Sequence, residues 1–123
     1  MAYMTASDLT KMMIDYLKAR GNDVWRNNNL AVKGRSFIGR KGIGDIIGYS
    51  KKYGQFISAE IKTIADRVSP DQLSFMNELG SSNGIAMLIQ QIRDESIVMT
   101  IFKDYEEKKC KFDFDKNDFY ETD

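Results

Sequence analysis

The sequence contains no histidine and a single cysteine, Cys110. Without histidine, Ser-His-Asp and Cys-His catalysis are excluded, and so is the usual imidazole general base. One cysteine excludes an internal disulfide framework and a cysteine-based zinc site. Hydrolytic chemistry on this chain must therefore rely on carboxylates, lysine, tyrosine or a metal ion bound through oxygen.

Long apolar runs are also absent. No run approaches the roughly 20 residues that span a bilayer, and the N-terminus lacks the apolar core of a signal peptide. We therefore expect a cytoplasmic protein without membrane association. The 123 residues, with one proline and nine glycines, are typical of one globular domain. We expect a single domain over 1–123, with its core at about 5–102 and an acidic, aromatic extension at 103–123.

Charge is distributed unevenly along the chain although the net charge is zero. Residues 1–63 hold eleven Lys/Arg and five Asp/Glu, a net charge of +6, so residues 64–123 carry −6. A basic half attracts a polyanion such as nucleic acid if its charges share one surface. Scattered over several faces, the same charges only solvate the protein, and composition does not decide between the two.

Apolar residues at helical spacing predict a helix over residues 5 to about 20. Its apolar face comprises Leu9, Met12, Met13, Tyr16 and Leu17. Thr5 or Ser7 is expected to cap the start, and Gly21 to follow the end.

A second helix is predicted to begin after Ser69. Ser69, Pro70 and Gln72 occupy the N-cap, N1 and N3 positions of a capping box. Gly80 is expected to end this helix. The helix is thus bounded by a start signal and a stop signal.

Extended segments separate and follow the helices. Strands are expected at 23–27, 30–38, 45–49, 55–63 and 84–90, with an Asn-rich turn at 27–29. Residues 97–102 form either a further strand or the start of a helix. Residues 50–54 are expected to turn the chain between 45–49 and 55–63 as a hairpin. These elements predict an α/β domain with a mixed central sheet flanked by helices.

Asp45, Glu60 and Lys62 form the constellation with the clearest chemistry. In the predicted hairpin the start of the first strand lies near the end of the second, so Asp45 and Glu60 approach each other. Glu60 and Lys62 share one face of their strand, while Ile61 points to the other. Two carboxylates with a lysine form an oxygen-rich site suited to Mg²⁺ or Mn²⁺. Such an ion activates water and stabilises charge on a phosphoryl oxygen, with Lys62 assisting.

The alternative is a surface ion pair on a half-exposed sheet, since acid and lysine pairs at this spacing are common. Two features favour the metal site. Glu60 lies in an apolar strand, where an unpaired charge is costly. Gly42 and Gly44 precede Asp45 and are expected to let the backbone approach a bulky ligand.

Five segments occur in an order and spacing that resemble a known group of enzymes. They are VWRNN at 24–28, GIGDIIG at 42–48, AEIKT at 59–63, RVSPDQ at 67–72 and GIA at 84–86. Together they resemble the PD-(D/E)xK nucleases, and within that superfamily the virus-type replication-repair nuclease (VRR-NUC) domains. The similarity covers residues from about 5 to 90.

The resemblance implies a restriction-endonuclease-like core and a Mg²⁺- or Mn²⁺-dependent endodeoxyribonuclease. Asp45 and Glu60 would be metal ligands, joined by the backbone carbonyl of Ile61, and Lys62 would be the catalytic lysine. Gln72 would support the site or contact the substrate. Stand-alone members are typically small phage or bacterial proteins that form homodimers and cut branched DNA, such as Holliday junctions, in DNA repair.

The sequence departs from the family pattern at two places. Gly44 stands where the family usually has proline, a change that is expected to be tolerated because neither residue offers a side-chain ligand. The glutamate that the family usually carries on the first helix is missing. Asp8 is the nearest acid and a candidate metal ligand, or else simply a helix N-terminal residue that suits the helix dipole.

Further residues are candidates for contact with DNA. The candidates for contact with phosphates or the DNA backbone are Asn27, Asn28, Arg35, Arg40 and Lys41. The alternative is that the basic residues are only solvated surface charges and that the asparagines only form a turn. Trp25 and Tyr49 either stack on bases or, as is usual for aromatic residues on short strands, belong to the core.

Two other functions remain open from the sequence. One is a catalytically inactive DNA-binding module of the same fold that uses its basic half for phosphate contact. The other is a structural or protein-interaction role in which the carboxylates are merely paired on the sheet. Loss of Mg²⁺-dependent cleavage in Glu60→Gln would exclude the first, and absence of DNA and metal binding would favour the second.

Overall fold

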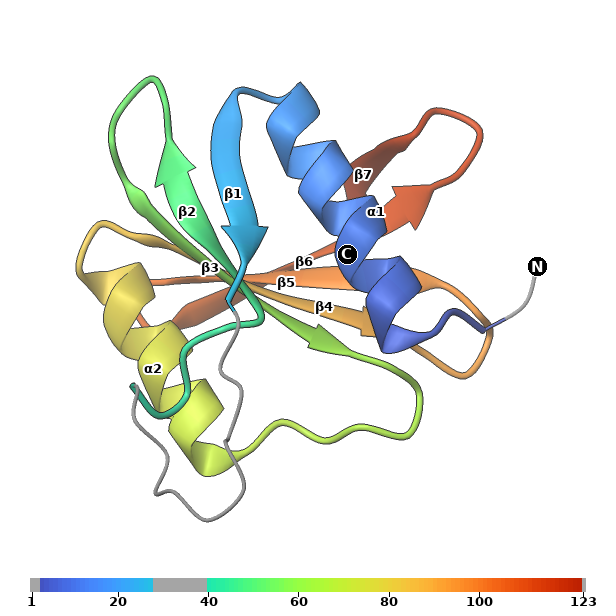
Figure 1. Ribbon diagram of the computed structural model, residues 1–123. Helices are drawn as coiled ribbons and strands as arrows, with labels where there is room; N and C mark the ends of the chain where they lie inside the picture. Colours follow the sequence, from blue (N-terminus) through green and yellow to red (C-terminus); the bar gives the residue numbers. More distant parts are fainter. Residues whose placement is uncertain (1–2, 28–39, 123) are drawn as a thin grey trace, which may run out of the picture.

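The structure, a computed structural model, describes residues 3–27 and 40–122, which form two helices and a seven-stranded sheet (Figure 1). The helices are α1 (Ala6–Ala19) and α2 (Pro70–Ser81). The strands are β1 (Asn22–Arg26), β2 (Ile46–Ser50), β3 (Phe56–Lys62), β4 (Ile85–Gln91), β5 (Ile97–Lys103), β6 (Glu106–Asp113) and β7 (Asp118–Glu121).

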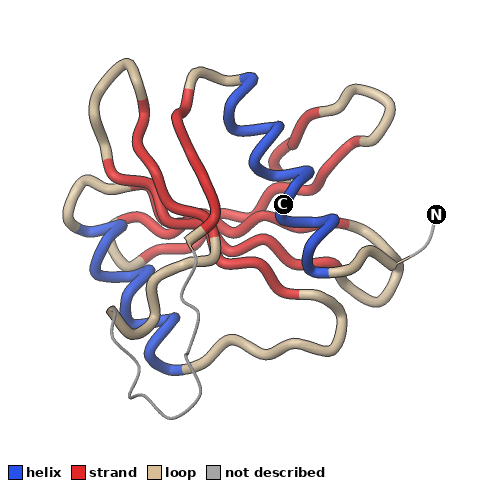
Figure 2. The backbone as a smooth tube through the Cα atoms, viewed as in Figure 1, coloured by secondary structure: helices blue, strands red, loops and turns tan. Residues whose placement is uncertain are grey.

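The strands lie side by side in the order of the sequence, from β1 to β7. β3 and β4 are parallel, and every other neighbouring pair is antiparallel. A parallel pair needs a crossover connection, which α2 supplies, whereas antiparallel neighbours need only short turns. Figure 2 shows the strands gathered between the two helices. The fold is therefore α/β with a mixed sheet flanked by helices, as the sequence predicts.

The two helices cover opposite faces of the sheet. One core cluster joins α1 to the apolar side of β3, with Leu9, Met13, Leu17, Ile57, Ala59 and Ile61 among its buried members. The other cluster joins Met76 of α2 to Ala86, Leu88 and Phe102. Because side chains alternate along a strand, Ser58, Glu60 and Lys62 point to the face that carries α2. We call this the α2 face, and the opposite one the α1 face.

The ends of α1 follow from local hydrogen bonds. The Thr5 hydroxyl accepts a hydrogen bond from the Asp8 N–H at 3.1 Å, so Thr5, and not Ser7, is the N-cap. Gly21 follows the helix with φ of +86°, as expected of a residue that ends a helix. Neither helix of the described part of the chain has the length and hydrophobicity needed to cross a membrane.

The predicted capping box of α2 is present, but its predicted end is wrong. Ser69 and Gln72 exchange the two capping hydrogen bonds. The helix runs through Gly80 to Ser81. A Cβ at residue 80 would lie 2.1 Å from the carbonyl oxygen of Phe102, so this glycine lets α2 pack closely on β5 and does not stop the helix.

Four predicted strands are found with each end shifted by one residue, namely those expected at 23–27, 45–49, 55–63 and 84–90. Residues 97–102 belong to a strand, β5. The strand expected at 30–38 and most of the turn at 27–29 lie outside the described residues. The extension at 103–123 contributes β6 and β7, which continue the sheet, and it supplies Cys110 and Phe112 to the core on the α1 face.

Candidate functional site

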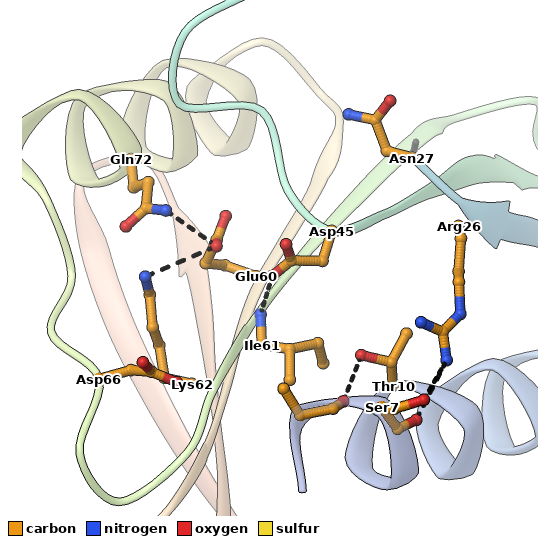
Figure 3. A pocket seen from close by; sticks show the side chains of 11 residues that line it. Ser7, Thr10, Arg26, Asn27, Asp45, Glu60, Ile61, Lys62, Asp66 and Gln72 are labelled. Carbon is orange, nitrogen blue, oxygen red and sulfur yellow. Dashed lines mark hydrogen bonds and ion pairs between the residues drawn. The ribbon is translucent and has the colours of Figure 1, made fainter. Parts of the chain in front are cut away.

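A pocket of about 430 Å³ lies where β1, β2 and β3 approach α1 and α2 (Figure 3). Its walls come from α1, β1, β3 and α2 and from the segments beside them, including the position directly before β2. The lining residues are Ala6, Ser7, Thr10, Arg26, Asn27, Asp45, Glu60, Ile61, Lys62, Asp66 and Gln72. The pocket thus contains Asp45, Glu60, Ile61, Lys62 and Gln72, which the sequence predicts to act together.

The register of β2 and β3 brings the two acids together. Ile46 pairs with Ala59, so the next position along, Asp45, lies opposite Glu60 on the α2 face. The Ile61 N–H donates a hydrogen bond of 2.8 Å to Asp45 Oδ2. This bond fixes the Asp45 carboxylate beside β3, where Figure 3 shows it next to Glu60.

Glu60 is buried and only partly hydrogen-bonded. The residue belongs to β3, between β2 and β4, and is 3% exposed. Oε1 accepts a hydrogen bond from Gln72 Nε2 at 2.9 Å and lies 3.7 Å from Lys62 Nζ. Oε2 has no hydrogen-bond partner among the described residues. An ionised carboxylate in this position is costly unless a proton or a cation compensates it.

The electrostatics of the pocket agree with that geometry. Burial, and next the negative charge of Asp45, raise the pKa of Glu60 from 4.5 to about 8. The ammonium group of Lys62 opposes this rise without cancelling it. Two carboxylates this close favour either one shared proton or one bound cation, because each disfavours the ionisation of the other.

Gln72 links the start of α2 to the acids. Its Oε1 accepts the Ser69 N–H within the capping box, while its Nε2 donates to Glu60. One side chain therefore closes the helix N-terminus and holds a pocket carboxylate. Because the oxygen and the nitrogen of this amide are both hydrogen-bonded, it orients Glu60 more firmly than a free amide would.

Gly42 and Gly44 serve the protein's own packing, which corrects the expectation that they make room for a ligand. A Cβ on Gly42 would lie 2.2 Å from the Asp71 carbonyl oxygen, and Gly42 has φ of +82°. A Cβ on Gly44 would lie 2.5 Å from the Ala59 carbonyl oxygen. The Gly44 N–H also donates to Ser58 Oγ at 2.8 Å. A proline at this position would have no N–H to donate, so glycine and Ser58 together anchor the start of β2.

The donor set fits a small divalent cation that is only partly enclosed by protein. Asp45 and Glu60 offer carboxylate oxygens, one of which is buried and has no hydrogen-bond partner within residues 3–27 and 40–122. The described residues contain no group of three or more Asp, Glu, Cys or His side chains that could hold a metal. An ion here would have two carboxylate ligands and would keep several waters, which is typical of Mg²⁺. The Ile61 carbonyl as a third ligand stays a prediction.

The wall contributed by α1 and β1 was not anticipated from the sequence. Arg26 Nη2 donates to the Ser7 carbonyl oxygen at 3.2 Å and to Ser7 Oγ at 3.1 Å. Thr10 also lines this wall and donates its hydroxyl to the Ala6 carbonyl oxygen. Figure 3 shows Arg26 and Ser7 across the pocket from Lys62. The pocket therefore has a positive group on each side of the acids.

Other predicted residues lie outside this arrangement. Asp8 is exposed and does not line the pocket, so the structure brings no first-helix acid to the two carboxylates. Arg40 is 3.5 Å from Glu78 and lies over the ring of Phe75, and so is docked on α2. Lys41 is exposed and is not a lining residue.

The remaining candidates for DNA contact are divided between the pocket and the part of the chain that is not described. Asn27 lines the pocket, and its side-chain amide donates to the Gly44 carbonyl oxygen at 3.2 Å. Asn28 and Arg35 lie outside the described residues. Contact with DNA stays a prediction for these three residues.

No protein-family model matches the chain, and no curated protein matches it. Among solved structures, the chain is similar to Hjc from Archaeoglobus fulgidus, described as a Holliday junction resolvase from an archaeal hyperthermophile. The two share 16% sequence identity, the match covers 90% of each chain, and the TM-score is 0.47. A similarity this low decides neither family nor activity, which have to be inferred from the pocket and its motifs.

Proposed function

We propose that this protein is a divalent-metal-dependent endonuclease that hydrolyses phosphodiester bonds in DNA. The observation that carries the proposal is the buried Glu60 oxygen beside Asp45 that has no hydrogen-bond partner in the described part of the chain, with Lys62 and Gln72 on the same carboxylate. The proposal is also supported by the resemblance of the Asp45, Glu60 and Lys62 pattern to the PD-(D/E)xK nucleases.

Each residue of the pocket has a separate role in this proposal. Asp45 and Glu60 would hold Mg²⁺ or Mn²⁺, which when bound supplies Lewis-acid activation of water and neutralises charge on the phosphate. Lys62 places an ammonium group where negative charge develops on the phosphoryl oxygens. Gln72 keeps Glu60 oriented toward the pocket. Arg26 offers a guanidinium group to a phosphate on the opposite wall.

Branched DNA, such as a four-way junction, is the substrate that the sequence resemblance favours. A symmetric junction is resolved by two cuts, which a two-fold homodimer with two pockets makes at equivalent strands. Both the substrate and the homodimer are part of the proposal and are tested separately from the hydrolysis itself.

The test is a cleavage assay on end-labelled linear, flap and four-way DNA, with Mg²⁺, Mn²⁺ or EDTA. We expect the wild type to cut only with a divalent ion, and to cut the branched substrates faster than the linear duplex. Glu60→Gln and Lys62→Met are each expected to lower the rate by roughly 10²–10³-fold. The matched control is Lys109→Met, which removes an exposed lysine of β6 far along the sheet and is expected to cut at the wild-type rate.

Three outcomes would contradict the proposal in different ways. Metal-independent cleavage, or undiminished cleavage by Glu60→Gln, would show that the pocket does not catalyse the reaction. DNA binding without cleavage by the wild type would favour the inactive DNA-binding module. Absence of both DNA binding and metal binding would favour the protein-interaction role.

A further inference from the structure

Three aromatic side chains on neighbouring strands are exposed to solvent. Trp25 on β1 is 48% exposed, Tyr49 on β2 is 42% exposed and Phe56 on β3 is 40% exposed. The expectation that aromatic residues on these short strands belong to the core is therefore wrong for Trp25 and Tyr49. We call the three side chains the aromatic platform.

The strand register places the platform on the same face as the acids. Tyr49 pairs with Phe56, and Trp25 pairs with Ile47, which in turn pairs with Ser58. Directly paired residues share a face, and Ser58 shares its face with Glu60, so the platform belongs to the α2 face. At about 3.4 Å per residue, the Trp25 row lies roughly 7 Å from the acids along the strands, and the Tyr49 row roughly 14 Å.

Neither helix of the described part of the chain covers this area. α1 packs on the opposite face, and α2 packs on β4 and β5. The platform is held in place nonetheless, because the Tyr49 hydroxyl donates to Asp23 Oδ2 at 3.1 Å. Lys62 lies beyond one end of the platform, and the exposed Lys51 and Lys52 lie in the turn at the other. A rigid apolar surface with cations at both ends suits a ligand that has both flat apolar and anionic parts.

The area of the platform is too small for a stable protein partner. Aromatic side chains present roughly 150–250 Å² each, so the exposed fractions amount to about 300 Å². A stable protein interface buries about 800 Å² on each partner. Stacking of a few nucleobases needs no more than one ring per base. The area, the flanking lysines and the continuity with the pocket therefore favour a nucleic acid over a second protein chain.

We propose that the aromatic platform of Trp25, Tyr49 and Phe56 stacks unpaired nucleobases of the substrate next to the pocket. This inference rests on the proposed function and refines it, because bases are available for stacking only where a strand is unpaired. The favoured substrates are then DNA branches that expose single-stranded nucleotides beside the cut, such as flaps and opened junctions. Fully paired duplex hides its base faces and gains nothing from the platform.

Trp25 is the only tryptophan of the chain, so its fluorescence reports directly on the platform. The experiment titrates Glu60→Gln protein in EDTA, which prevents cleavage, with a thymidine oligonucleotide about 12 nucleotides long. Two probes of the same length serve as controls: the corresponding duplex, and a strand of abasic sites that carries the phosphates without bases. We expect saturable quenching by the thymidine strand and little quenching by either control.

Single substitutions then separate stacking from phosphate binding. Tyr49→Ala and, as a second variant, Phe56→Ala are expected to raise the dissociation constant of the thymidine strand roughly 5- to 100-fold. The matched control is Tyr105→Asn, which removes a 72% exposed aromatic side chain in the distant β5–β6 turn, where asparagine tolerates the positive φ. It is expected to change the dissociation constant less than about twofold.

The outcomes distinguish this inference from the proposed function. No quenching by the thymidine strand, or equal quenching by the abasic strand, overturns the platform even if the wild type cleaves DNA with Mg²⁺. Quenching as expected supports the platform even if no cleavage is found, in which case the nuclease proposal fails alone. Sedimentation supplies the remaining outcome: a dimer that Trp25→Ala converts to monomer would make the platform a protein interface and overturn the inference.

Discussion

Glu60 is buried beside Asp45, and its replacement by glutamine measures how much stability the protein loses when a second negative charge forms in the pocket. The pKa of Glu60 in the folded protein is about 8, above its ordinary value of 4.5. Between these two pH values the folded protein binds a proton at Glu60 that the unfolded chain has lost. The free energy of unfolding therefore falls as the pH rises through this window, and is greatest below it.

The expected magnitude follows from the width of the window. One pH unit corresponds to about 1.4 kcal/mol for one proton, so the wild type is expected to lose about 3–5 kcal/mol of stability from Glu60 across the window. Glutamine has the shape of the neutral carboxyl and does not ionise. Glu60→Gln should therefore lack this loss, while the other titrating groups affect both proteins alike.

Urea denaturation followed by circular dichroism measures the effect, in EDTA at constant ionic strength from about pH 5 to about pH 8. We expect the two proteins to differ little near the acid end, and Glu60→Gln to become increasingly the more stable as the pH rises. Mg²⁺ at the alkaline end should stabilise the wild type and not the variant, because a cation compensates the charge. Parallel stability curves, or a gap that widens toward acid pH, would refute the description of Glu60 as a buried acid whose ionisation is costly.

Three further substitutions test the structure around the pocket. Gly44→Ala is expected to destabilise the protein by about 1–3 kcal/mol in thermal denaturation, because the new methyl group meets a carbonyl oxygen of β3. The control is Gly54→Ala, where the space is open and only the positive φ opposes the change, and it should cost about 1 kcal/mol. Equal destabilisation by the two substitutions would contradict the close approach at Gly44. Gln72→Leu, measured by urea denaturation, is expected to cost about 1–3 kcal/mol because it removes a capping bond and the donor to Glu60; an unchanged midpoint would be inconsistent with that double role. Lys62→Met is expected to raise the pKa of Glu60 further and so to extend the loss of stability to higher pH, because the cation that opposes the rise is gone. A loss that ends at the same pH as in the wild type would argue against that contact.

The centre of the site was predictable because it depends on local rules. Asp45 and Glu60 meet because a hairpin pairs the start of one strand with the end of the next, and Glu60 and Lys62 share a face because side chains alternate. The capping box predicted Gln72 at N3 of α2, whereas its place beside the acids was implied only by the resemblance to the nucleases. The positions of Asp45, Glu60 and Lys62 follow from sequence spacing alone.

The wall formed by Ser7, Thr10 and Arg26 was not predictable by such rules. Its residues come together because α1 packs across β1 at a particular angle, and that angle is set by the whole apolar core on the α1 face. The sequence carried one weak signal for Arg26. This residue ends β1 and pairs with Ile46, the residue directly after Asp45. Tertiary packing, and not sequence spacing, determines this part of the pocket.

The last two strands escaped prediction for a different reason. Residues 106–109 of β6 are all exposed, so polar side chains occupy both faces and the alternation typical of a strand is missing. The turn before β6 places Asp104 and Tyr105 at positive φ without glycine, which removes the usual hairpin signal. Only Cys110 and Phe112 carry the apolar alternation, which is too short to identify a strand.

The central claim is that Asp45 and Glu60 hold one divalent ion between them. A crystal structure of the wild type grown with Mn²⁺ tests it most directly, because Mn²⁺ gives an anomalous difference peak that locates the ion. We expect one peak in the pocket, within about 2.0–2.3 Å of a carboxylate oxygen of each residue, and no such peak in Glu60→Gln. An empty pocket at saturating Mn²⁺, or an equal peak in the variant, would contradict the claim.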